Sequence, residues 1–178
     1  DSTPTPVGLW AQEHAMEAIK AENADQLRDA LTDIDLVVTV GYGLLLPQVI
    51  LDLPTHGFIN LHFSLLPRWR GAAPVQRAIE AGDALSGVTV FQLDAGMDTG
   101  PIYHRDRFAL DDDISADELL QELSFVGVET VLRTIDDISR GKRPVPQSHD
   151  GATRAMKLTR EEGRIDFTRS AEAVSAHI

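Results

Sequence analysis

Two short, nearly continuous apolar runs constrain the fold of this chain more than any other sequence feature. Residues 36–40 and 58–62 are dominated by β-branched or large apolar side chains, and a glycine- or proline-containing loop follows each run. Runs of this length are typical of strands buried on both faces of a parallel sheet. Helices are expected at residues 24–32, 47–51 and 74–81. Because strands and helices alternate, the sequence predicts a three-layer α/β fold with a mostly parallel sheet.

The second half of the chain continues the pattern with two further strands and one long helix. Strands are expected at residues 88–93 and 102–109, and the spacing of Ser115 and Glu118 predicts a capping box that begins a helix ending at Gly141. The stripe of this helix that faces the core is predicted to contain Leu119, Leu120, Leu123, Val131, Leu132, Ile135 and Ile138.

Length and composition limit the class of protein. A chain of 178 residues with 43% hydrophobic residues can bury one substantial core, and its apolar runs are too short to cross a membrane. The sequence contains no cysteine, which excludes disulfides, thiolate metal sites and a cysteine nucleophile. No targeting signal is recognised, so a cytoplasmic protein without membrane partners is expected. The first residue is Asp1 rather than Met, which suggests that the sequence begins inside a longer protein.

The charge is unevenly distributed. A net charge of −12 argues against a general nucleic-acid binder. Residues 53–79, however, contain no acidic side chain and carry Arg68, Arg70 and Arg77. This locally cationic segment is consistent with an anionic ligand, and equally consistent with three arginines solvated on a surface loop.

Asn60 and His62 are the first candidate site residues. Residues two apart on a strand face the same side, so both polar side chains point together at the end of the run. Asp98, between Gly96 and Gly100, lies in the loop after another expected strand. If the loops meet, a carboxylate can orient the imidazole and an asparagine amide can donate to a developing oxyanion. The alternative is a histidine that serves only packing.

Three other kinds of site are rejected. Gly41 and Gly43 resemble the start of a dinucleotide fingerprint, but Leu46 occupies its third glycine position. The six histidines show no paired metal-ligand spacing, so no metal is expected. Ser64 lacks the motif of an activated serine, which favours attack by an external nucleophile over covalent catalysis.

Several motifs resemble one known superfamily. Asn60-Leu-His-Phe-Ser-Leu-Leu-Pro67, Gly87-Val-Thr-Val90 and Asp98-Thr-Gly100 resemble the folate-dependent formyltransferases. Within that superfamily, residues 68–77, and the segments 42–47 and 157–166, are similar to the branch that formylates methionyl-tRNA.

The resemblance implies a Rossmann-like formyltransferase domain. It implies that Asn60, His62 and Asp98 are catalytic and that 10-formyltetrahydrofolate supplies the formyl group to methionyl-initiator tRNA. It further implies a folate site lined by Ser64, Leu65, Leu66 and Pro67, with the turn at residues 42–46 packing near the pterin.

The resemblance also implies boundaries. Residues 1–141 would form a partial catalytic domain lacking the family's first strands, and residues 142–178 a linker and the start of a C-terminal domain. A monomer in the bacterial cytosol is expected, with an organelle as the alternative compartment. The rival functions are formyl transfer to glycinamide ribonucleotide or an amino sugar nucleotide, hydrolysis of formyltetrahydrofolate, and folate binding without catalysis.

Overall fold

The structure, a computed structural model, describes residues 5–19, 21, 23–43 and 45–177. The chain divides into two compact units, Asp1–Ile34 and Asp35–Ile178. The first unit contains helices α1 (Pro6–Glu13) and α2 (Ala24–Ala30). The second unit contains every strand of the described chain and all of the candidate site residues, so the site is built within one unit.

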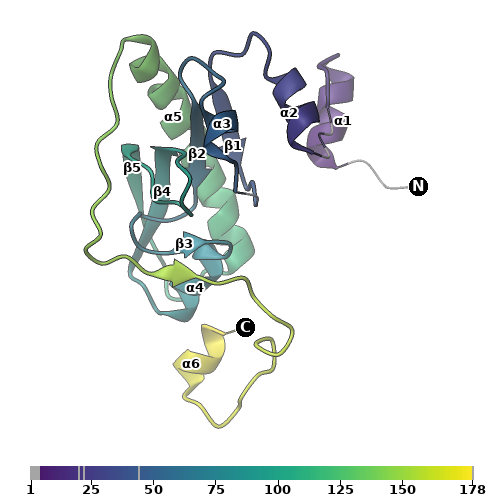
Figure 1. Cartoon of the computed structure of the whole chain (residues 1–178). Helices are drawn as coiled ribbons and strands as arrows, with labels where there is room; N and C mark the ends of the chain where they lie inside the picture. The colour runs from purple at the N-terminus through teal and green to yellow at the C-terminus, as the bar shows by residue number, and fades with distance from the viewer. Residues whose placement is uncertain (1–4, 20, 22, 44, 178) are drawn as a thin grey trace. The chain divides into compact units, whose positions relative to one another are not determined.

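A four-stranded sheet organises the second unit (Figure 1). Its order is β1 (Val37–Val40), β2 (Phe58–His62), β4 (Leu85–Gln92) and β5 (Ile102–Ala109). Strands β1 and β2 run parallel, as predicted, whereas β2–β4 and β4–β5 are antiparallel. The described sheet is therefore mixed. The loop of residues 93–101 is too short for a crossover, so β4 and β5 pair as a hairpin.

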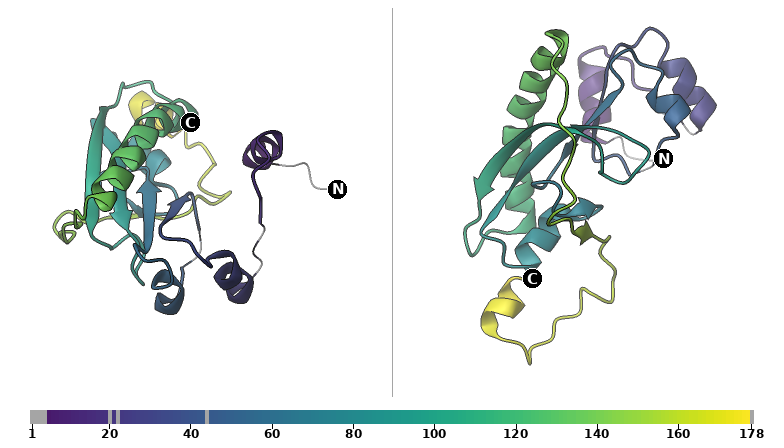
Figure 2. Two further views of the ribbon diagram at one scale, coloured as in Figure 1. Left: turned by 90° about the horizontal axis from the view of Figure 1, so that it is seen from above. Right: turned by 60° about the vertical axis from the view of Figure 1, so that its left-hand side comes forward.

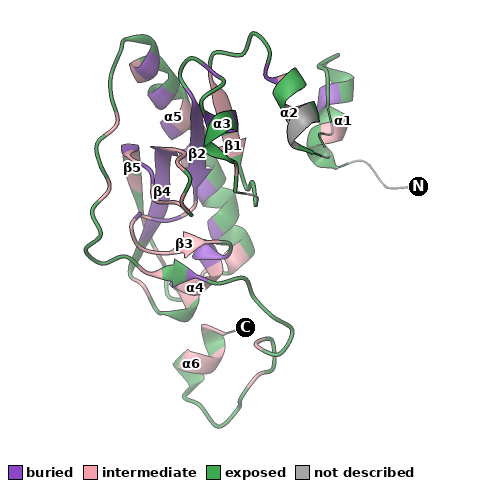
Figure 3. Ribbon diagram, viewed as in Figure 1, coloured by how far each residue is buried: buried purple, intermediate pink, exposed green. Residues whose placement is uncertain are grey.

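Helix α5 (Ala116–Ser139) lies along one face of the sheet, together with α4 (Pro74–Glu80) (Figure 2). Strands β2 and β4 are the most buried part of the sheet (Figure 3). The main core is formed by side chains of β2, β4, α4 and α5, namely Ile59, Leu61, Val75, Val88, Val90, Leu119, Leu123 and Ile138. The predicted capping box is present, because Ser115 and Glu118 bond reciprocally. None of the helices in the described residues has the length and apolar character needed to cross a membrane.

The buried stripe of α5 differs from the predicted one. The residues it buries are Leu119, Leu123, Gly127, Thr130, Thr134 and Ile138, whereas Leu120, Leu132 and Ile135 are exposed. Threonine can replace the leucines because its hydroxyl is satisfied inside the core: Thr130 donates to Asp106 and Thr134 donates to the Thr130 carbonyl. Gly127 leaves room for Leu61, whose Cδ2 atom would lie 2.6 Å from an added Cβ.

Residues 142–155, which we call the strap, run from the end of α5 past β5 (Figure 1). Val145 exchanges backbone hydrogen bonds of 2.7 and 2.8 Å with Ile102. The strap ends in β6 (Arg154–Ala155), which pairs in parallel with β3 (Arg70–Gly71). The predicted domain boundary at residue 141 stays a prediction, but the strap packs on the unit that contains the sheet.

Two short helices complete the second unit. Helix α3 (Gln48–Leu51) lies between β1 and β2 in the chain, and α6 (Ala171–Ser175) follows the strap.

Candidate active site

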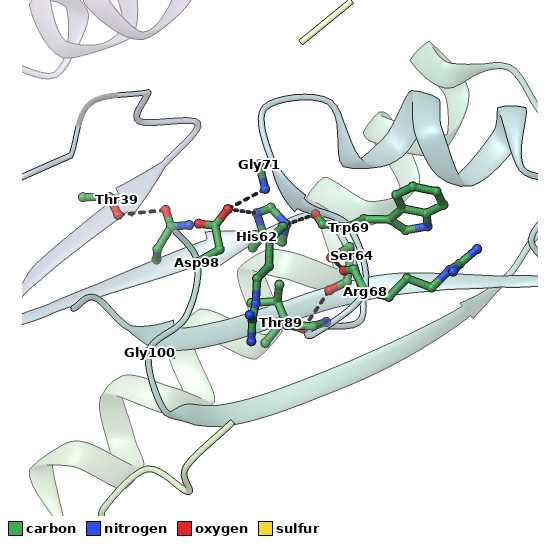
Figure 4. Close-up of polar contacts among 12 residues, drawn as sticks. Thr39, His62, Ser64, Arg68, Trp69, Gly71, Thr89, Asp98 and Gly100 are labelled. Carbon is green, nitrogen blue, oxygen red and sulfur yellow. Dashed lines mark hydrogen bonds and ion pairs between the residues drawn. The ribbon is translucent and has the colours of Figure 1, made fainter. Parts of the chain in front are cut away.

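Asn60 and His62 lie on the face of β2 that is turned away from α5. Ile59 and Leu61, the residues that alternate with them, belong to the core packed against α5. Asn60 is 8% exposed and His62 is 6% exposed, so both are largely withdrawn from water. The His62 and Phe91 rings pack in a T-shaped arrangement with 6.4 Å between their centroids. A buried strand thus carries two polar side chains on one face, and Figure 4 shows His62 next to Asp98.

The amide of Asn60 is oriented by a neighbouring strand. Thr39 lies opposite Asn60 in the β1–β2 register, and its hydroxyl donates to Asn60 Oδ1 at 2.8 Å. This bond leaves the amide nitrogen, Nδ2, as the free donor of the side chain. Within the described part of the chain, Nδ2 has no hydrogen-bond partner. The site therefore presents an oriented N–H donor.

The His62 ring is fixed by a backbone carbonyl. Nε2 lies 2.8 Å from the carbonyl oxygen of Trp69. A carbonyl only accepts, so Nε2 carries a hydrogen and donates it. Nδ1, on the other side of the ring, lies 3.8 Å from Asp98 Oδ2, within ion-pair distance when the ring is protonated. Asp98 thus faces the nitrogen that the backbone does not hold.

The loop carrying Asp98 runs back along the sheet to reach His62. Strand β4 ends at Gln92, which pairs with Ile59 near the start of β2. His62 is at the opposite end of β2 and pairs with Thr89. Because β4 is antiparallel to β2, strand topology alone does not bring Asp98 to His62. The loop of residues 93–101 needs anchors of its own.

Several hydrogen bonds hold this loop. Inside it, the Asp94 carboxylate accepts from the Gly96 N–H at 3.0 Å and from the Thr99 hydroxyl at 2.7 Å. Outside it, the Gly71 N–H donates to Asp98 Oδ2 at 2.7 Å. Asp98 has a φ of 53°, in the left-handed region that a non-glycine residue adopts only at a cost.

The segment predicted to line the folate site is partly closed. Ser64 is fully buried and donates to the Arg68 carbonyl at 2.7 Å. Leu66 is 1% exposed and packs in a small cluster with Phe91. Leu65 and Pro67 are half-buried. Of these four side chains, Leu65 and Pro67 are therefore the two that have surface available to contact a ligand.

The turn expected near the pterin is only partly described. Residue 44 lies outside the described residues. On either side of it, Tyr42 is 45% exposed and Leu45 is 61% exposed, so both have surface available for a ligand.

The three arginines of the cationic segment are used within the protein. Arg68 donates from Nε and Nη2 to Asp83 at 2.8 and 2.6 Å, and its guanidinium lies 4.3 Å from the Trp69 ring centroid. Arg77 pairs with Glu80 at 2.7 Å and with Glu162 at 2.6 Å. Arg70 instead donates to the neutral amide of Gln147. Two of the three positive charges are therefore neutralised.

The Asp83 carboxylate anchors the side chains of Arg68 and Trp69. Removing its charge should destabilise the fold in a pH-dependent way. Burial alone would raise the pKa of the Asp83 carboxyl, but hydrogen bonds from Arg68 and Trp69 outweigh it and lower the pKa. A lowered folded-state pKa stabilises the protein above the unfolded pKa of about 4, and this contribution is lost as pH falls through the folded value. Asp83→Asn should cost about 1 kcal/mol at pH 7.

Urea unfolding of both proteins between pH 7 and pH 3 measures this effect. The stability difference should shrink as pH falls from about 4 towards the lowered pKa of the folded carboxyl, because the charge of Asp83 is lost over that range. Asp112→Asn, in an exposed acidic turn, is the matched control and should show no such change. A difference that stays constant down to pH 3 would contradict the role of the Asp83 charge.

Three residues that contact the site were missed by sequence reasoning. Thr39 offered a signal, because it is the polar residue within an apolar run. Gly71 and Gln147 offered none, since their roles depend on contacts with residues 27 and 49 positions away. No group of three or more His, Cys, Asp or Glu side chains in the described ranges is arranged to hold a metal ion.

Comparison with known proteins defines the class. A sequence model described as formyl transferase matches residues 2–135 of this chain. The chain belongs to the formyl transferase family.

Relatives and solved structures specify the similarity further. The chain is 46% identical over 173 residues to a methionyl-tRNA formyltransferase of Idiomarina loihiensis, covering 94% of this chain and 55% of the relative. It resembles an N-formyltransferase of Helicobacter canadensis, solved with folinic acid and dTDP-3-aminofucose, with a TM-score of 0.80 at 19% identity. That match covers 100% of this chain and 64% of the other.

A third match is a phosphoribosylglycinamide formyltransferase of Bacillus halodurans, with a TM-score of 0.70 at 24% identity, covering 80% and 79% of the two chains. The Rossmann-like α/β formyltransferase fold is thereby confirmed. The chain spans just over half the length of the Idiomarina relative.

Proposed function

We propose that this chain carries the catalytic site of an enzyme that transfers a formyl group from 10-formyltetrahydrofolate to methionyl-initiator tRNA. The observation that carries the proposal is the arrangement of Asn60, His62 and Asp98 on one face of the sheet. An oriented amide N–H, a backbone-fixed imidazole and a carboxylate 3.8 Å from that imidazole suit acyl transfer to an amine. The identity to a methionyl-tRNA formyltransferase supports the choice of acceptor.

The proposed reaction needs no covalent enzyme intermediate. The free α-amine attacks the formyl carbon, a new C–N bond forms, and the carbonyl oxygen becomes an oxyanion, to which Asn60 Nδ2 and protonated His62 Nδ1 donate. The oxyanion then returns to a carbonyl, and the bond from the formyl carbon to N10 of the folate breaks. Asp98 orients His62 and helps the proton lost by the amine to reach N10, either directly or through water.

We place the folate site beside Asn60, His62 and Asp98. Leu65 and Pro67 offer apolar surface for the folate, and the turn at residues 42–46 offers further surface. Folate serves as the formyl donor and leaves as tetrahydrofolate, and no metal is required. Arg70, which donates to the neutral amide of Gln147, is the cation proposed to face anionic substrate groups.

Acceptor competition tests this function. The complete natural protein is incubated with 10-formyltetrahydrofolate and methionyl-tRNA, glycinamide ribonucleotide, an amino sugar nucleotide, or no amine. Formyl-methionyl-tRNA is the expected main product. Preference for another amine would replace the proposed acceptor, and formate release without amine would identify a hydrolase. Folate binding without any turnover would indicate a binding module.

The remaining expectations are part of the same proposal. We place the protein in the bacterial cytosol as a monomer, with residues 142–178 leading from a catalytic domain of residues 1–141 into a C-terminal domain that helps to hold tRNA. The bacterial sources of the relatives support the location.

A further inference from the structure

Gln147 occupies an unusual place for a residue of a connecting segment. It lies in the strap, yet its side-chain amide makes four hydrogen bonds to two loops of the candidate site. Nε2 donates to the backbone carbonyls of Asp98 at 3.1 Å and Gly100 at 3.0 Å. Oε1 accepts from Arg70, from Nε at 2.8 Å and also from Nη2. Both donors and the acceptor of the amide are therefore engaged.

These bonds connect Asp98 to residues 69–71 through both its backbone and its side chain. Gln147 holds the backbone of Asp98 to Arg70, and the next residue, Gly71, donates its N–H to the Asp98 carboxylate. The preceding residue, Trp69, accepts from His62 through its carbonyl. The same three consecutive residues thus contact both the histidine and the aspartate. Residues 69–71 therefore connect His62 to Asp98, and Gln147 bridges Arg70 of this segment to the backbone of Asp98.

The contacts inside the Asp98 loop do not involve Gln147. The Asp94 carboxylate bonds within the loop, and the Gln92 N–H donates to the Pro101 carbonyl at 2.8 Å where the loop closes. Neither contact reaches residues 69–71, and the bond from the Leu93 N–H to the Phe58 carbonyl, at 2.8 Å, holds only the start of the loop to β2. The contact of the loop with residues 69–71 is made by Gly71 and Gln147, and Gln147 is the side chain that links Asp98 to Arg70.

We propose that Gln147 is a positioning residue, which holds Asp98 opposite His62 and Arg70 beside the same loop. The proposal rests on the proposed catalytic role of Asn60, His62 and Asp98. Gln147 touches no reacting atom in this arrangement and acts through Asp98. A misplacement of about 1 Å at a reacting group can cost about 100-fold in rate, so the loss of Gln147 should lower turnover substantially.

Two substitutions separate the two halves of the amide. Gln147→Met keeps the approximate size and removes all four bonds. Gln147→Glu keeps acceptors for Arg70 but faces the carbonyls of Asp98 and Gly100 with a carboxylate. Both should lower kcat by roughly 10- to 100-fold and leave the KM for the formyl donor within about two-fold. Gln121→Met, on the exposed side of α5, and Ser148→Ala, in the strap, are matched controls and should keep wild-type kcat.

If Gln147 acts through Asp98, a further result is expected that a residue with a purely structural role would not give. In an Asp98→Asn background, Gln147→Met should cause little additional loss of kcat, because the positioned carboxylate is already gone. Full additivity of the two losses would overturn the proposal. Wild-type kcat in both single variants would overturn it as well.

A measurement without turnover separates this proposal from the proposed function. NMR signals of the His62 ring are recorded for the complete protein and for the Gln147→Met and Asp98→Asn variants. In Gln147→Met they should move towards their positions in Asp98→Asn. Unchanged ring signals would overturn the role of Gln147 even if the wild-type enzyme formylates methionyl-tRNA. Moved signals would support it even if the acceptor proves to be another amine.

Discussion

Replacing His62 with alanine should lower kcat for formyl transfer by roughly 10²- to 10³-fold, the usual loss when one oxyanion donor is removed. The ring donates from Nε2 to the Trp69 carbonyl, which leaves Nδ1 and Asp98 for chemistry. Folate binding should largely survive, because the proposed folate contacts come from Leu65, Pro67 and the turn at residues 42–46. Single-turnover formyl transfer and equilibrium folate binding measure the two effects separately.

A second histidine gives the matched control for this experiment. His56→Ala removes an exposed imidazole from the same structural unit and should leave kcat unchanged. Asp98→Asn should cause a loss similar to that of His62→Ala, and the double variant should lose little more, since the two residues act as one unit. Near-normal turnover in either single variant would refute the assigned roles.

Gly100→Ala should be the most damaging single-methyl change in the site, with a loss of roughly 3 kcal/mol in the free energy of unfolding. A Cβ at this position would lie 1.8 Å from the Gln92 carbonyl oxygen and 3.3 Å from Phe91 Cδ2. The nearer obstacle is backbone of β4 and cannot rotate away. The loop must shift instead, and Asp98 lies two residues before the substitution.

Denaturant unfolding and formyl transfer should both report the Gly100→Ala change. Gly163→Ala is the matched control, because its added Cβ would meet only the Arg160 carbonyl oxygen, at 3.4 Å. If Gly100→Ala matches the wild type in both stability and turnover, the close approach of this loop to β4 is wrong. A variant with wild-type stability but reduced turnover would show that the loop shifts and that the effect lies in the position of Asp98.

Local sequence patterns predicted the elements better than their arrangement. The strands at residues 58–62 and 102–109 and the capping box at Ser115 were predicted correctly, because each depends on residues close together in the chain. The direction of β4 depends on how residues 63–84 cross the sheet, and no local pattern encodes it. The buried face of α5 was misjudged at Leu132, since hydrophobicity alone hides the satisfied hydroxyls of Thr130 and Thr134.

The same distinction applies to the site. Asn60 and His62 were predicted to share a face from strand alternation, and the structure agrees. The meeting of Asp98 with His62 required a loop that runs back along the sheet, which spacing cannot predict. The cationic character of residues 53–79 was overestimated, because Asp83 and Glu162 lie outside that segment and neutralise Arg68 and Arg77.

The left-handed backbone at Asp98 narrows the residues that can occupy this position before any chemistry is considered. Aspartate and asparagine tolerate a φ near 53°, whereas glutamate and most other side chains do so less readily. An Asp98→Glu variant would therefore change the main-chain path as well as the reach of the carboxylate. Asp98→Asn is therefore the substitution that removes the charge while keeping a residue that tolerates this backbone conformation. Library screens at residue 98 would return a short list of survivors for conformational reasons as well as catalytic ones.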